Sequence, residues 1–147
     1  MGDSEERLDV GEAIARLNDA LSLQYRSSQQ YMLSSGSLFG FEFQALGDRL
    51  WEYAMAELAD ARRLVEKIVA LGGAPTTEMA PLEWTGEPDS AVDRLIEIES
   101  EAVETLQLAI EPTGREGRSE ALEHMLEHVI MRKQDQVDFL LRARRSS

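Results

Sequence analysis

The sequence predicts an all-α protein: an antiparallel four-helix bundle in a single domain over residues 1–147. Four segments carry apolar residues three or four positions apart, which is the pattern of amphipathic helices. Glycine and proline gather at residues 72–88 and 112–117, between those segments. No stretch shows the apolar–polar alternation of a strand. We therefore expect helices at about residues 10–36, 42–71, 90–110 and 119–144.

Local signals mark the ends of the predicted helices. Asp9 and Glu12 have the spacing of a capping box before the first helix, and Ser90 and Asp93 repeat it before the third. Gly72-Gly73 is a C-terminal cap for the second helix. The link up to about residue 89 is long enough to run from one end of a bundle to the other. The second and third helices are therefore predicted to be parallel, joined by a crossover.

Each predicted helix carries polar residues on the face that its apolar residues define. An acid such as Glu57, in the middle of an apolar stripe, needs a metal, a cation or a proton to be tolerated there. Because mid-helix residues of a bundle share one layer, we expect these groups to converge. They are Gln24 on the first helix, Glu57 and Asp60 on the second, Glu99 on the third, and Lys133 and Gln136 on the fourth.

Composition excludes several classes of function. The chain has no cysteine, which removes disulfides, thiolate metal sites and thiol nucleophiles. A net charge of −13 argues against nucleic acid and anionic membranes as partners. There is no apolar run of membrane-spanning length, and the first residues do not have the pattern of a signal peptide. We expect a cytoplasmic protein.

The chain resembles the ferritin-like superfamily, and bacterioferritins most closely, from about residue 17 to residue 141. The resemblance rests on the order and spacing of several short phrases. They are Leu17-Asn18, Gln30-Tyr31 with Leu33, Glu57 followed by Ala61 and Leu64, Leu71 to Pro75, Glu99 within Ile-Glu-Ser-Glu-Ala, and Val137-Asp138-Phe139-Leu140.

The resemblance implies a di-iron centre whose ligands this chain keeps only in part. In that family, one Glu from each of two helices and a Glu-x-x-His pair from each of the other two hold the metals. Tyr31 matches a tyrosine beside the family's centre, and is either a redox neighbour or an ordinary core tyrosine. Position by position, Glu57 and Glu99 match bridging carboxylates, Gln24 replaces a terminal Glu, Asp60 replaces the first His, and Lys133 and Gln136 replace the second Glu-x-x-His pair.

Two interpretations of this altered centre remain open. In the first, Lys133 takes the place of the metals and neutralises Glu57 and Glu99, while Gln24 and Gln136 complete the hydrogen bonds. In the second, Glu57, Asp60 and Glu99 hold one ion; such oxygen ligands suit Mg, Mn or Ca better than Zn. Iron therefore stays a candidate cofactor by kinship, with both imidazoles of the di-iron set missing.

Two functions correspond to these interpretations. The first is a bacterioferritin-related protein of iron handling, with an altered centre and an impaired or lost ferroxidase activity. The second is a non-catalytic structural or interaction protein whose metal site is replaced by a lysine–glutamate network. Leu58 stands where haem-binding members place an axial Met. Met55 is the methionine one turn away, and haem is not expected.

Outer faces of the predicted helices add two expectations. His124 and His128, with Glu127, have the spacing of a surface metal chelate, although they lie opposite the apolar stripe and a solvated face is the favoured interpretation. Apolar residues off the main stripe of the second helix form a second packing surface. Proteins that the chain resembles form dimers through this surface, so we expect a homodimer or a larger homo-oligomer. These residues are Trp51, Met55 and Leu58. No fifth helix is expected, which argues against a mineral-storing shell.

Overall fold

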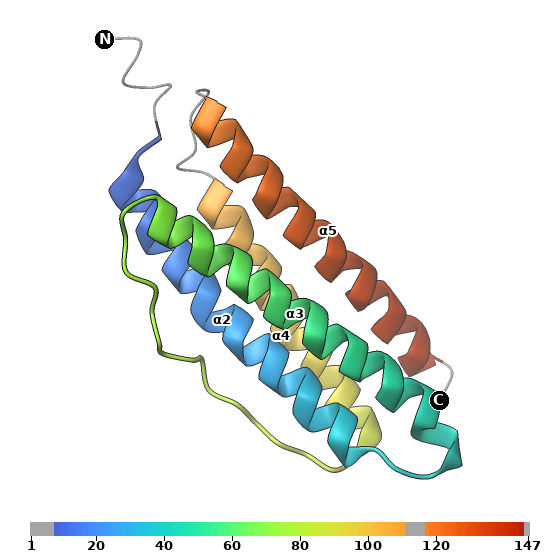
Figure 1. The fold of residues 1–147 in the computed structure, drawn as a ribbon. Coiled ribbons are helices and arrows are strands. Elements are labelled where there is room, and N and C mark those ends of the chain that lie inside the picture. Colours follow the sequence, from blue (N-terminus) through green and yellow to red (C-terminus); the bar gives the residue numbers. More distant parts are fainter. Residues whose placement is uncertain (1–7, 111–116, 146–147) are drawn as a thin grey trace.

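The computed structural model describes residues 8–110 and 117–145, and the all-α prediction is confirmed in these ranges. The elements are α2 (Val10–Ser37), the short 3₁₀-helix η1 (Phe41–Phe43), α3 (Gln44–Ala70), α4 (Pro88–Ile110) and α5 (Gly117–Arg145). Within the described part of the chain there is no strand, and the four α-helices pack lengthwise as a bundle (Figure 1).

The helix ends follow local hydrogen bonding. At the start of α2, Asp9 accepts a hydrogen bond from the Glu12 backbone N–H at 3.0 Å. At the end of α3, Gly72 has φ +89°, and its N–H donates to the Val69 carbonyl at 3.0 Å. The N–H of Gly73 donates to the Ile68 carbonyl at 2.9 Å, which completes a Schellman motif.

Two predicted boundaries need correction. The start of α4 is at Pro88 rather than near Ser90, because the Glu87 carboxylate caps it by accepting from the Ser90 backbone N–H at 2.7 Å. Asp93 pairs with Arg144 of α5 at 2.8 Å instead of closing a capping box. The second predicted helix is divided, since residues 41–43 form η1 before α3 begins.

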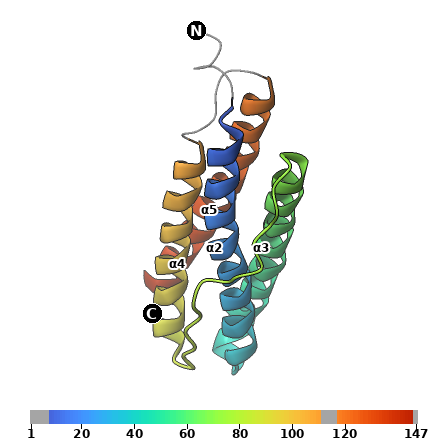
Figure 2. The same cartoon turned by 90° about the vertical axis from the view of Figure 1, so that its left-hand side faces the viewer.

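The link between α3 and α4 crosses the length of the bundle along α2 (Figures 1 and 2). Side chains spaced along α2 hold it. Asn18 binds the backbone of Ala74 and Thr76 at 3.1 and 2.8 Å, and the Gln30 amide donates to the Glu83 carbonyl at 2.6 Å. The crossover makes α3 and α4 parallel, as predicted for this topology.

The buried apolar side chains form two clusters at different levels of the bundle. One includes Leu17, Leu21, Leu64, Ile68, Leu106, Leu122 and Leu126. The other includes Tyr31, Leu50, Leu95, Ile98 and Leu140. In each helix, the residues between the two clusters occupy an intermediate level of the bundle. The polar residues that the sequence predicts to converge lie at this level. None of the described helices combines the length and hydropathy needed to cross a membrane.

Candidate functional site

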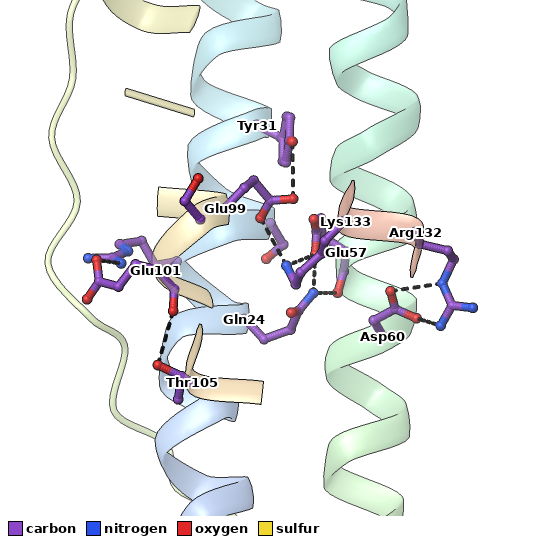
Figure 3. A network of polar contacts seen from close by, with 12 residues as sticks. Gln24, Tyr31, Glu57, Asp60, Glu99, Glu101, Thr105, Arg132 and Lys133 are labelled. Carbon is purple, nitrogen blue, oxygen red and sulfur yellow. Dashed lines mark hydrogen bonds and ion pairs between the residues drawn. The ribbon is translucent and has the colours of Figure 1, made fainter. Parts of the chain in front are cut away.

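Lys133 of α5 lies at the centre of the polar layer. Its side chain is fully buried, and its Nζ donates to Glu57 Oε2 at 2.8 Å and to Glu99 Oε1 at 2.9 Å. The two acids come from α3 and α4 and are themselves buried. One ammonium therefore joins three helices at a single level, as Figure 3 shows.

Two amides and a hydroxyl complete the hydrogen bonding around the carboxyl groups. Gln24 of α2 donates from Nε2 to the Glu57 carbonyl at 2.8 Å and to Glu57 Oε2. With its amide nitrogen facing the acids, Gln136 donates to Glu57 Oε1 at 2.7 Å and to Glu99 Oε2 at 2.9 Å. The Tyr31 hydroxyl donates to Glu99 Oε2 at 3.3 Å. The structure thus brings together six of the polar residues singled out in the sequence.

The pKa values of the two acids are shifted in opposite directions. Burial, followed by the charge of Glu99, raises the pKa of Glu57 well above its usual range. Burial also opposes ionisation of Glu99, but the charge of Lys133 and the hydrogen bonds to the Glu99 carboxylate together outweigh burial, and the pKa of Glu99 is lowered. For Lys133, burial would lower the pKa, yet the charges of Glu57 and Glu99 prevail and raise it. The centre therefore favours the protonated form of Glu57 and the ionised form of Glu99, which pairs with the ammonium.

Asp60 is directed away from this centre. Its carboxylate forms a two-pronged ion pair with Arg132 of α5, with atom separations of 2.5 and 3.2 Å, and Arg63 approaches it at 3.5 Å (Figure 3). The sequence argument did not single out Arg132. Its place next to Lys133, on the helix that faces α3, could have indicated a contact with α3. However, an arginine beside an apolar stripe is usually solvated, so the sequence pattern does not distinguish the two.

Besides Lys133, Arg26 is a buried cation, and helix periodicity did not identify it. Arg26 of α2 is 5% exposed, and its Nη2 lies 2.7 Å from Glu101 Oε2 of α4. This pair stands outside the central network, as Figure 3 shows by the position of Glu101. It ties α2 to α4 on the side of the bundle away from Asp60.

The surface candidates lie apart from the centre. His124 and His128 are exposed on α5, and His124 Nδ1 is 3.8 Å from Glu127. Among residues 8–110 and 117–145, no group of three or more His, Asp or Glu side chains has an arrangement able to hold a metal ion. On α3, Trp51, Met55 and Leu58 are each about half exposed (51, 51 and 50%).

The donor set of the centre does not fit a pair of iron ions. It offers two carboxyl groups, two amides and an ammonium, and the amides and ammonium donate to the oxygens that a metal would need. A di-iron centre of this fold uses four carboxylates and two imidazoles.

An all-α bundle with a long crossover and a polar layer at mid-height is the architecture of the ferritin-like proteins. The sequence model of the Ferritin-like domain family matches residues 14–143, so the chain belongs to this family. The resemblance noted in the sequence is thereby confirmed.

Solved structures agree with this fold. A Rhodobacter capsulatus bacterioferritin, described with a metal-free dinuclear site and haem iron, superposes with a TM-score of 0.83 at 20% identity, covering 91% of this chain and 84% of that one. Ferritin-like diiron-carboxylate proteins from Bacillus anthracis str. Ames give 0.85 at 24% identity, covering 92% and 97%. No curated protein sequence matches.

We predict that Lys133→Met destabilises the protein by about 3–5 kcal/mol, because it leaves buried acids without their cation. The loss should be smaller at low pH, where both acids can be neutral. Urea unfolding of the variant and wild type at several pH values measures this. Lys67→Met, which removes a charge at the partly exposed end of α3, is the matched control and should change little. Equal effects of the two substitutions would contradict a central role for Lys133.

A second prediction concerns the proton on Glu57. A group whose pKa is raised on folding contributes stability that is complete below its unfolded pKa and is lost as pH rises. Glu57→Gln removes this dependence, so the variant should gain stability relative to wild type as pH increases from about 4.5. The slope is at most about 1.4 kcal/mol per pH unit. For the control, in which the exposed Glu66 is changed to Gln, the difference in unfolding free energy from wild type should not depend on pH. If the difference for Glu57→Gln is also independent of pH, the raised pKa of Glu57 is refuted.

Proposed function

We propose that this protein is a ferritin-like bundle without a di-iron ferroxidase centre, which acts as a structural or interaction protein. The observation that carries this proposal is the contact of one fully buried ammonium with both central carboxyl groups, at 2.8 and 2.9 Å. The buried carboxyl groups need positive charge beside them, which bound metal ions supply in metal-loaded proteins of this fold. Here the ammonium of Lys133 supplies it.

Electrostatics disfavours adding metal to this arrangement. A divalent cation that bridged Glu57 and Glu99 would lie at about contact distance from the Lys133 ammonium. At 4 Å and an effective dielectric constant near 20, that repulsion is on the order of 8 kcal/mol. Metal binding would therefore require Lys133 to lose its proton or leave the centre, and its raised pKa opposes the first of these.

The iron-handling alternative with a single ion needs Asp60 beside Glu57 and Glu99. Asp60 is paired with Arg132, so using it as a ligand would break a charge-assisted pair. The observed contacts favour the lysine–glutamate network over this alternative. They also give Tyr31 the role of a core tyrosine that hydrogen-bonds an acid.

The outer face of α3 supports an assembly role, and we propose that it forms a homodimer. Trp51, Met55 and Leu58 follow one another at intervals of four and three residues, each half exposed, which is the spacing of a helix face made for packing. Beside them lies a groove of about 800 Å³ whose apolar lining includes Tyr25 and Val65.

Charge placement on the same face suits two copies related by a two-fold axis. If two α3 helices pair antiparallel about Glu57's level, Glu52 of one copy is opposite Arg62 of the other. An isologous contact makes every such pairing twice. This charge placement supports the proposed dimer, and we propose that the dimer acts in the cytoplasm.

Iron chemistry gives the direct test of the proposed function. When ferrous iron is added to the purified protein in air, ferric product should form no faster than in buffer alone. The near-ultraviolet absorbance of the ferric product measures this rate. Lys133→Glu combined with Gln136→His should increase metal binding, since it returns a carboxylate and an imidazole to the centre. Catalysed oxidation by the wild type, or two irons per chain in this layer by anomalous scattering, would refute the proposal.

Assembly is tested separately. Met55→Glu places a charge at the centre of the proposed contact and should convert a dimer into a monomer, as measured by multi-angle light scattering. Met131→Glu is the matched control, because Met131 is 61% exposed on α5, away from this face. A monomeric wild type, or a dimer insensitive to Met55→Glu, contradicts the proposed interface without bearing on the iron test.

A further inference from the structure

A groove between α3 and α5 differs from the rest of this acidic molecule. It encloses about 870 Å³, which is within the range of small-molecule sites. Arginines of both helices line it, and two aromatic rings lie between them. We call it the α3–α5 groove, and the residues used below are Arg49, Tyr53, Asp138, Phe139, Arg142 and Arg145.

The arginines are not explained by the end of α5 alone. Basic residues near a helix C-terminus interact favourably with its dipole, which accounts for Arg142 and Arg145. Arg49 belongs to α3, and its guanidinium carbon lies 5.4 Å from the centre of the Phe139 ring. Two helices therefore contribute cations to one groove, in a chain whose net charge is −13.

The aromatic rings form a continuous apolar wall. Tyr53 and Phe139 meet edge to face at 5.7 Å, and Tyr53 meets Tyr31 in the same manner at 5.6 Å. Tyr53 and Phe139 are only partly buried, so they are accessible from the groove. Burial raises the pKa of Tyr53, although Arg49 opposes the rise, and the hydroxyl therefore remains a hydrogen-bond donor at neutral pH.

Aspartates limit the charge that the groove can accept. Asp135 and Asp138 line it together with three arginines, which leaves one net positive charge among the lining residues, and Glu52 lies outside the lining at 3.8 Å from Arg49. That balance favours a ligand with a single anionic group over a polyanion. The flat, partly exposed rings favour an aromatic body, since stacked or edge-to-face ring pairs add to simple burial of apolar area.

We propose that the α3–α5 groove binds a small organic anion, with its aromatic body against Tyr53 and Phe139 and its anionic group at Arg49 and Arg142. Guanidinium groups bind phosphate and carboxylate through charge-assisted hydrogen bonds. The groove is open to solvent, so binding weakens as ionic strength rises. This site is independent of the metal content of the bundle centre.

The experiment uses the full chain and 1-naphthyl phosphate, with binding followed by calorimetry and by backbone amide shifts in NMR at low ionic strength. Saturable binding is expected, with shifts confined to residues around Arg49, Tyr53 and Phe139. Arg49→Gln should weaken binding about tenfold, the loss of one charge-assisted contact. Arg16→Gln is the matched control: it removes an arginine from the other end of the bundle, where Arg16 pairs with Glu12, and should leave affinity unchanged.

Two further ligands separate the contributions. Inorganic phosphate and neutral 1-naphthol should each bind at least about tenfold more weakly than the naphthyl phosphate. Naphthol binding as tightly would show an apolar patch only, and phosphate binding as tightly would show a non-specific cationic surface; either overturns the proposal. So would unchanged affinity in Arg49→Gln. If that variant fails to fold by circular dichroism, the exposed Arg142, changed to Gln, provides the same test.

Discussion

The compensation of two buried acids by one lysine is the interaction on which the rest of the structure depends. Without a cation or a proton, Glu57 and Glu99 could not remain in an apolar core, because desolvation of each carboxylate charge costs several kcal/mol. Lys133 supplies that cation from α5, Gln24 also donates to Glu57 Oε2, and Gln136 donates to the two carboxyl oxygens that Lys133 leaves. All four helices thus contribute to one satisfied network. A bundle sustained in this way needs no metal to tolerate its central acids.

The network also explains how the core is divided. Apolar clusters above and below it bury leucine and isoleucine side chains, whose non-directional contacts specify the register of the helices less strictly than hydrogen-bonded groups do. The polar layer admits one register, since a shift by one turn would leave Lys133 or an acid unpaired. Specificity of register is therefore its structural contribution, in the way that single buried polar residues fix register in coiled coils.

Periodicity was sufficient to predict the fold and the convergence of Gln24, Glu57, Glu99, Lys133 and Gln136. Each of these lies near the centre line of an apolar stripe, so its direction follows from the helix alone. Asp60 shows the limit of that argument: it lies at the edge of its stripe, where a small helix rotation decides between the centre and Arg132. Arg26 and the capping of α4 by Glu87 depend on neighbours that periodicity does not identify.

The interface between α3 and α5 connects the centre to the surface. Its close contacts are made by long side chains rather than by backbone approach: Lys133 with Glu57, Arg132 with Asp60, and Phe139 with Tyr53. From Glu99, the contacts continue through the Tyr31 hydroxyl and ring to Tyr53 and the α3–α5 groove. The lysine–glutamate centre and the α3–α5 groove thus both belong to the pairing of α3 with α5.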